Sequence, residues 1–396
     1  MPKQVITEID YSGAGASQAI STAVFVPGLL GTSAKVSSGS ITLCENETEF
    51  KTQIGTNTAD KSWVIAHQLV KLGLPVYFAG YSSAEALSAA LSGTDLWTEI
   101  QDRGLYDIRF ITLGATEPTS TLCVKAIEAA AGRGDAIALV DHPSSLTKIV
   151  GNSGETTIPS FFQTVKTGMT DVGNLKYAAG FTPWCYCNGI AESEGISTAS
   201  TNYDLPATFI YLGAFAKSLQ KNRSWLAAAG SYRGLCAFEF TPKAKFGDAA
   251  VNALQSRTAE AIAINPICNV RPFGDIVWGN RTLLPNSATV EGGLVASSFL
   301  NIRQLATDIK KTVYNAARKL TFEPNDNLLW SAFCAEVQPI LDVMKSGRGI
   351  DGGRIIRVAT SEKATVKARV RVVPIEAVED FYIQLEMADS LEVVEG

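Results

Sequence analysis

Both ends of the chain have the pattern of a β-strand with no partner nearby, and this constrains the fold more than any other feature. Near each end, apolar residues alternate with polar ones, which is the pattern of a strand with one buried face. The apolar members of the two alternations are Val5, Ile9, Tyr11, Phe381, Ile383, Leu385 and Met387. Because a lone strand is unstable in water, each terminal segment must join a sheet, either in its own subunit or in a neighbouring one.

A glycine-rich stretch separates the first of these strands from the rest of the chain. Gly13 and Gly15 lie in the run Gly-Ala-Gly-Ala-Ser, which predicts a flexible hinge. The run begins like a dinucleotide-binding fingerprint, but Gln18 stands where the third glycine belongs. No apolar strand-helix context surrounds it, so a hinge is the favoured interpretation.

The interior of the chain predicts a mixed α/β (α+β) fold. Residues 107–113 are expected to form a strand and residues 119–131 a helix, followed at 136–140 by the continuous apolar run of a buried, parallel strand. We expect four regions along the chain. These are an N-terminal β-arm with hinge at 1–21, a small outer domain at 22–104, the main α/β domain at 105–373 and a C-terminal β-arm at 374–396.

Two helices and a strand are expected after residue 300. Residues 301–320 carry an apolar stripe at spacings of three and four, and residues 328–344 form a second helix interrupted by Pro339. The following strand, 366–372, has one apolar face and one basic face. At 100° per residue, the first helix also has a cationic face, made of Arg303, Lys310, Lys311 and Arg318.

Charge is unevenly distributed along the chain. The whole sequence has 34 basic and 39 acidic residues, a net charge of −5. Residues 301–371 contain thirteen basic and seven acidic residues, whereas 374–396 contain seven acidic residues and no basic one. The basic block and the acidic tail could pair within one chain or between neighbours, or both could be ordinary solvated faces. The overall balance does not predict a nucleic-acid partner.

Hydrophobic residues make up 46% of the sequence, but the apolar runs fall far short of the ~20 residues that cross a bilayer. We therefore expect no membrane insertion. We assign the high proportion of hydrophobic residues to contacts between subunits. The N-terminus lacks the apolar core of a signal peptide, which predicts folding in a cytoplasm. Cys185 and Cys187 form a C-x-C pair without a nearby histidine, so the seven cysteines are interpreted as reduced thiols, with no metal or cofactor.

Catalytic motifs are scarce. There are only two histidines, and no phosphate loop, zinc helix or nucleophile elbow occurs. The best enzyme-like feature is the pair Asp141 and His142, directly after the apolar run, where carboxylates often act on ligands. A capping aspartate explains the same position equally well. A cytosolic α/β enzyme acting on a small molecule at Asp141 and His142 remains the alternative.

One long segment, residues 261–283, resembles the signature region of contractile-tail sheath proteins. Its strongest part is Trp278, Gly279, Asn280, Arg281 and Thr282. Similar stretches occur at 22–28, 136–143, 224–230, 299–305 and 322–330, so the resemblance covers nearly the whole chain. Ala228 and Ala263 depart from the family pattern, which weakens assignment to a subgroup. We expect a structural role for this segment, with Trp278 filling the core and Arg281 satisfying buried carbonyls or a carboxylate.

The resemblance implies a non-enzymatic subunit with no cofactor. Such subunits form rings, typically of six, stacked around an inner tube, and their terminal arms add strands to neighbouring subunits. They contract without nucleotide hydrolysis and drive the tube through a cell envelope. The implied partners are other copies, the inner tail tube protein, and baseplate and tail-terminator proteins. The implied location is a bacterial cytoplasm, followed by assembly into a virion tail or contractile particle. The cationic face would then contact an acidic inner tube. A non-contractile shell protein is a third possibility.

Overall fold

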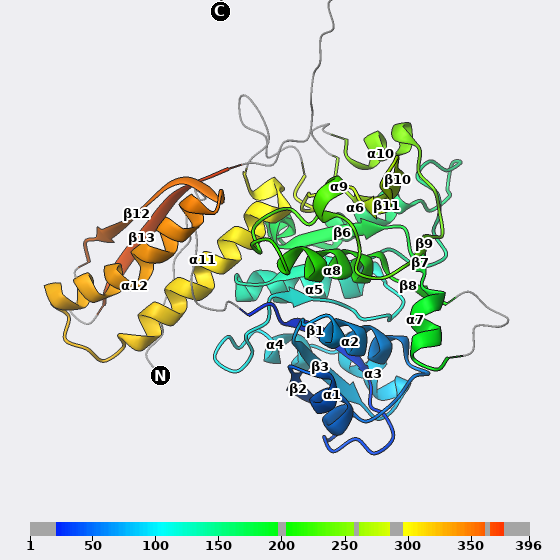
Figure 1. Cartoon of the computed structure of the whole chain (residues 1–396), viewed down its shortest axis with the longest axis horizontal. Helices are drawn as coiled ribbons and strands as arrows, with labels where there is room; N and C mark the ends of the chain where they lie inside the picture. The colour runs from blue at the N-terminus through cyan, green and yellow to red at the C-terminus, as the bar shows by residue number, and fades with distance from the viewer. Residues whose placement is uncertain (1–20, 197–202, 257–260, 286–295, 361–364, 376–396) are drawn as a thin grey trace, which may run out of the picture.

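The computed structural model describes residues 21–196, 203–256, 261–285, 296–360 and 365–375. Figure 1 shows a large body and a smaller module of residues 300–375 that projects from one side of it. The predicted arm residues (Val5, Ile9, Tyr11, Phe381, Ile383, Leu385 and Met387) and hinge residues (Gly13 and Gly15) lie outside the described residues.

The body is built on one eight-stranded sheet with the order β11-β10-β6-β5-β4-β1-β3-β2. The strands are β1 (Val24–Leu29), β2 (Ser40–Cys44), β3 (Val76–Tyr81), β4 (Phe110–Ile111), β5 (Ile137–Val140), β6 (Ala178–Thr182), β10 (Asn265–Val270) and β11 (Gly274–Val277). The six inner strands are parallel, and the two outermost strands are antiparallel to their neighbours. The expectation of a mixed α/β fold is therefore confirmed at the level of a central mixed sheet.

Residues 22–104 contribute three strands to this sheet. β1 pairs with β3 on one side and with β4 on the other, so the sheet continues across residue 104. The buried residues of 22–104 likewise share both of the body's hydrophobic clusters with residues from later in the chain.

Helices cover both faces of the sheet, as a mainly parallel sheet requires. On one face lie α1 (Glu47–Ile54), α2 (Lys61–Lys71) and α8 (Ala207–Leu219). On the other lie α3 (Ala84–Ser92), α4 (Asp95–Glu99), α5 (Ser120–Arg133) and α6 (Ile158–Gly168). The helix expected at 119–131 is α5, which starts where the Thr119 side chain accepts the Leu122 N–H and ends at Gly134 with a φ of 70°.

Shorter elements complete the body. They are α7 (Asn188–Ser193), α9 (Gly230–Arg233), α10 (Asp248–Leu254), the 3-10 turns η1 (Val172–Tyr177) and η3 (Ala296–Ser298), and a small sheet of β7 (Cys185–Tyr186), β8 (Asp204–Leu205) and β9 (Thr241–Pro242).

The projecting module has its own apolar core. It consists of α11 (Leu300–Lys319), α12 (Asn327–Ser346, with Pro339 inside), β12 (Ile350–Val358) and β13 (Lys367–Pro374). The predicted apolar stripe of α11 packs in this core with residues of α12 and β13. In the described part of the chain, no helix is both long and apolar enough to cross a membrane.

Candidate functional site

The Trp278–Thr282 segment ties the central sheet to the start of α11. The Asn280 amide donates to Oδ1 of Asn301 at 2.7 Å, and Asn280 Oδ1 accepts the Asn301 N–H at 3.1 Å. The Thr282 N–H donates to the carbonyl of Ser298 at 2.9 Å. These bonds join the chain after β11 to the first turn of α11, so the family segment fixes where the module leaves the body.

Asn265, at the start of β10, organises the middle of this segment. Its Oδ1 accepts the Arg281 N–H at 2.8 Å, and its Nδ2 donates to the carbonyls of Arg281 at 2.8 Å and Gly180 at 3.0 Å. A Cβ atom at Gly279 would lie 2.6 Å from Asn265 Oδ1, so only glycine fits there. The Arg281 side chain is buried, with its guanidinium 5.3 Å from the ring centre of Phe299, a cation–π contact.

The prediction that Trp278 fills the core is wrong. Its side chain is 38% exposed. Its N–H donates to the carbonyl of Pro266 at 2.8 Å, and its carbonyl accepts from Gln255 Nε2 at 2.7 Å. The backbone is thus held directly after β11, the edge strand of the sheet, while the residue stays partly exposed.

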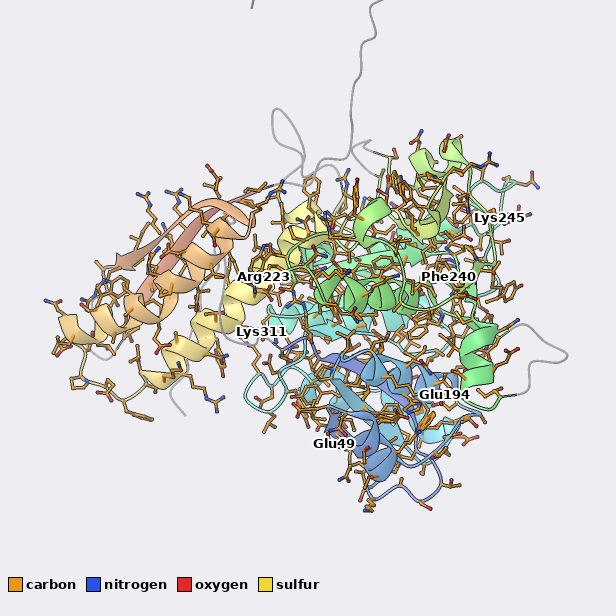
Figure 2. The ribbon with its side chains drawn as sticks, viewed as in Figure 1. Glu49, Glu194, Arg223, Phe240, Lys245 and Lys311 are labelled. Carbon is orange, nitrogen blue, oxygen red and sulfur yellow. The ribbon has the colours of Figure 1, made fainter. Side chains whose placement is uncertain are left out.

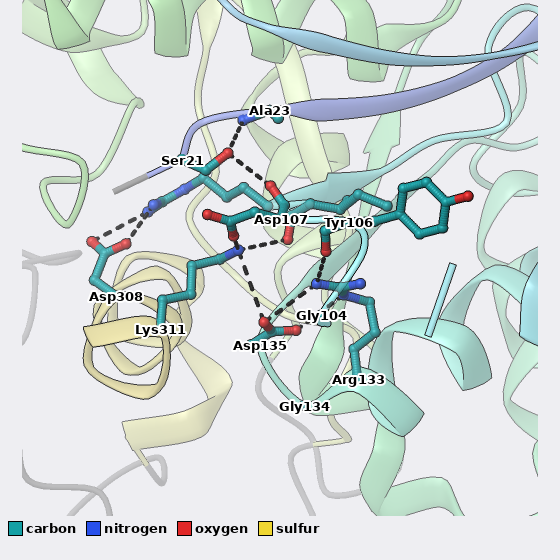
Figure 3. Close-up of polar contacts among 12 residues, drawn as sticks. Ser21, Ala23, Gly104, Tyr106, Asp107, Arg133, Gly134, Asp135, Asp308 and Lys311 are labelled. Atoms are coloured by element: carbon teal, nitrogen blue, oxygen red, sulfur yellow. Dashed lines mark hydrogen bonds and ion pairs between the residues drawn. The ribbon is translucent and has the colours of Figure 1, made fainter. Parts of the chain in front are cut away.

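The module meets the body through buried charges (Figure 3). Arg109, beside β4, and Asp308, on α11, both have fully buried side chains. Nη1 of Arg109 donates to Oδ1 of Asp308, and Nη2 lies 3.4 Å from Oδ2. The hydroxyl of Ser224 donates to the same Oδ2 at 2.6 Å. The Asp308 carboxylate therefore accepts from three donor atoms. This geometry offsets the free-energy cost of removing the two charges from water.

A second group of charges lies one turn further along α11. Lys311 forms an ion pair with Asp107, donates to the carbonyl of Ile108 at 2.9 Å and lies 3.9 Å from Asp135. Nε of Arg133 lies 3.0 Å from Oδ1 of Asp135. Burial lowers the pKa of Lys311 below its usual value, although Asp135 and Asp107 act in the opposite direction. We call the two groups together, Arg109, Asp308, Lys311, Asp107, Asp135 and Arg133, the charged joint.

The charged joint also anchors the first described residue. The Ser21 hydroxyl donates to the carbonyl of Asp107 at 2.7 Å and accepts the Ala23 N–H at 3.2 Å. Ser21 therefore lies close to the place where α11 docks on the body, as Figure 3 shows.

The predicted cationic face of α11 is mostly an internal packing face. Arg303 and Lys310 are buried, with the Arg303 guanidinium 4.3 Å from the ring centre of Tyr177. Lys311 is buried in the charged joint, and Figure 2 places it at the junction of module and body. Among the four residues, only Arg318 is exposed. The reason is that the body supplies acidic and aromatic partners for three of these cations, which the spacing along the helix does not reveal.

The outer sheet of the module has one apolar and one basic face, as the sequence predicts for its second strand. β12 and β13 are antiparallel and are the only strands of this sheet among the described residues. Val370 and Val372 are buried in the module core, whereas Arg369 and Arg371 are exposed on the opposite side. Val373 is 54% exposed beside them. The sequence did not predict β12, because Ile355 and Ile356 break the alternation there.

The Asp141 and His142 pair is buried and structurally engaged. The Asp141 carboxylate accepts the Thr208 N–H at 3.0 Å and the Thr208 hydroxyl at 2.6 Å, at the start of α8. Nε2 of His142 lies 2.8 Å from Oγ1 of Thr182. Burial raises the pKa of Asp141 to about 7 and lowers the pKa of His142 to about 4. This geometry matches the capping interpretation. In the described ranges, no group of three or more His, Cys, Asp or Glu residues could hold a metal ion.

Comparison with known proteins agrees with this architecture. No protein-family model matches the chain. The tail sheath protein of Vibrio phage KVP40 is 26% identical over 220 residues, which are 51% of this chain and 31% of that protein. A sheath structure of an extracellular contractile injection system, PVC, in the contracted state has a TM-score of 0.64 at 17% identity, covering 99% of this chain and 98% of that one. The chain has the fold of a contractile sheath subunit.

Two other solved structures share the fold. A chain of the anti-feeding prophage baseplate has a TM-score of 0.64 at 15% identity, covering 98% of this chain and 99% of that one. The sheath tail protein of Listeria innocua has a TM-score of 0.54 at 8% identity, covering 92% and 96%. The sequence match to the phage protein spans about a third of that relative's length. The buried Asp141 and His142 pair is hydrogen-bonded to Thr208 and Thr182 within the body.

Proposed function

We propose that this chain is the structural subunit of a contractile sheath, polymerising as stacked rings around an inner tube and contracting to drive that tube through a target envelope. Its partners would be other copies of itself, the tube protein, and the baseplate and terminator proteins at the two ends. The assembly would form part of a phage tail or a contractile injection particle, built in a bacterial cytoplasm.

The observation that carries this proposal is the small β12–β13 sheet. A two-stranded sheet is marginally stable alone and offers backbone donors and acceptors to added strands. The chain also carries two terminal segments with the alternation typical of β-strands. Strand addition between copies would give the edges of this sheet and the terminal segments a common partner. Main-chain hydrogen bonds would supply the affinity, and alternate side chains would supply the specificity. The arms are thus proposed to link subunits through this sheet.

Negative-stain electron microscopy of the purified full chain tests the proposal. We expect cylinders or stacked rings. The variant Ile383→Asp/Leu385→Asp should stay monomeric, because it puts two charges on the apolar face of the C-terminal strand. The matched control, Tyr382→Asp/Gln384→Asp, adds the same charge to the polar face and should polymerise.

Two results would contradict the proposal. Closed shells from the full chain would favour a non-contractile container. Normal cylinders from a chain lacking both residues 1–11 and 376–396 would show that the arms do not link subunits.

A further inference from the structure

A small cavity lies where the body meets α11, beside the charged joint. Its volume is about 160 Å³. This is several times the roughly 30 Å³ that one water molecule occupies in the liquid, but well below the about 300–1,000 Å³ of a pocket for a drug-sized ligand. Its charged and aromatic lining includes Arg103, Asp107 and Asp135 on the body side and Lys311, Tyr314 and Arg318 on the α11 side. The cavity therefore has room for a small ion that would touch both parts.

The charges of this lining are divided between two ends. Lys311 and Arg318 are two turns apart on α11, which is about 10 Å along the helix axis. Figure 3 shows the Lys311 end, where Lys311 forms the ion pair with Asp107 and lies 3.9 Å from Asp135. Arg133 also pairs with Asp135. Both carboxylates of the lining thus already have cations as partners, and they stand away from the Arg318 end.

Two guanidinium groups line the Arg318 end. The Arg103 guanidinium lies 5.7 Å from the ring centre of Tyr314, a cation–π contact. Tyr314 precedes Arg318 by four residues, and residues at that spacing lie side by side on a helix. The Tyr314 ring thus holds Arg103, from the loop between α4 and β4, on the side of α11 that carries Arg318.

These two arginines differ from the cations of the charged joint in having no counter-ion. Within the described ranges of the chain, neither Arg103 nor Arg318 lies within ion-pair distance of a carboxylate. Two like charges on facing parts of the molecule repel each other, so an anion between them would be attracted by both. This end of the cavity is therefore electrostatically incomplete.

We propose that the cavity binds a small tetrahedral oxyanion of the phosphate class, held between Arg103 of the body and Arg318 of the module. The planar fork of an arginine matches two phosphate oxygens at once, so two arginines on one cavity favour this class of ion over a halide. The bound ion crosses the boundary between body and module. It therefore stabilises the orientation in which the two arginines face each other over any orientation that separates them.

Isothermal titration calorimetry of the full chain with inorganic phosphate tests the proposal. Sodium chloride keeps the ionic strength constant, because screening weakens all exposed charges. Arg103→Gln and Arg318→Gln should each raise the dissociation constant by about tenfold or more, since each removes a charge-assisted pair of hydrogen bonds. Arg318→Lys keeps the charge but loses the fork, and should give an intermediate affinity.

Lys319→Gln is the matched control for the change in charge. Lys319 follows Arg318 directly but pairs with Glu336 of α12 at 2.8 Å. Its replacement should leave the affinity for phosphate within about twofold, because exposed ion pairs contribute little. Circular dichroism of each variant checks that the chain is folded.

Hydrogen–deuterium exchange measures whether the ion bridges the two parts. Saturating phosphate should slow amide exchange by roughly threefold or more both in residues 102–106 and in residues 314–319, because local opening would release the ion. Slower exchange in only one of these segments would overturn the bridge. Unchanged affinity in folded Arg103→Gln and Arg318→Gln, or an equal loss in Lys319→Gln, would overturn the site itself.

Discussion

The two sides of α11 form contrasting interfaces. Toward α12 and β13, the helix buries Leu305, Ile309 and Val313 in an apolar core. Toward the body, it buries Asp308 and Lys311 in the charged joint. Apolar packing tolerates small shifts because it has no preferred direction, whereas a buried ion pair is stabilising only in a narrow range of geometries. The contrast indicates that the apolar side holds the module together and the charged side fixes its orientation on the body.

The largest expected effect comes from breaking the buried pair on one side only. Asp308→Ala leaves the Arg109 guanidinium buried without its carboxylate, which should lower the free energy of unfolding by about 3–5 kcal/mol. Urea unfolding of the full chain measures this. Asp342→Ala, on the exposed side of α12, is the matched control and should change stability by less than about 0.5 kcal/mol. A loss of unfolding free energy below about 1 kcal/mol for Asp308→Ala would contradict the importance of the buried ion pair on the charged side of α11.

The apolar side should give a somewhat smaller loss. Leu341→Ala removes a buried side chain from the module core and should cost about 2–4 kcal/mol. Leu328→Ala on the same helix is a suitable control, since that side chain is 78% exposed. Because no charge is involved, the loss should be the same at low and high salt. A strong salt dependence would show that the two sides are not as distinct as the structure indicates.

Replacing both charges of the joint should cost much less than removing one. Arg109→Met combined with Asp308→Leu leaves no uncompensated charge, so stability should stay within about 1 kcal/mol of the unmodified chain. If the pair orients the module, the double variant should nevertheless form shorter or irregular polymers by electron microscopy. Regular polymers of normal length would leave the pair without an orienting role.

The smallest effect is expected at the exposed end of the helix. Arg318→Ala should change monomer stability by less than about 0.5 kcal/mol, in contrast to the buried Lys311 two turns before it. Co-sedimentation with purified tube protein then tests whether Arg318 retains the predicted tube contact. Undiminished binding would remove the last exposed member of the predicted cationic face from that role.

The sequence predicts elements well where the signal is local. The apolar stripe of α11, the two-sided strand β13 and the run that forms β5 all follow from spacing between neighbours in the chain. These patterns are visible because one face of each element is buried and the period identifies its type. Their boundaries agree with the structure to within a few residues.

The charged joint was harder to predict, because the residues that form its contacts are distant in sequence. Arg109 and Asp308 are 199 residues apart, and Lys311 and Asp107 are 204 apart. The helical pattern identifies a cationic face but not the Tyr177 and Asp135 that cover it. An acidic Asp308 among basic residues of the helix was the one local signal of a buried pair. Trp278 was misplaced for a similar reason, since its position after the edge strand β11 follows from a strand order that the sequence does not reveal.

The hydrogen bond between Ser21 and Asp107 has a mechanical consequence. Ser21 is held beside Lys311, where body and module meet. The same residue, Asp107, thus holds both Ser21 and the Lys311 side chain of α11, so a force carried through Ser21 would reach the boundary of body and module directly.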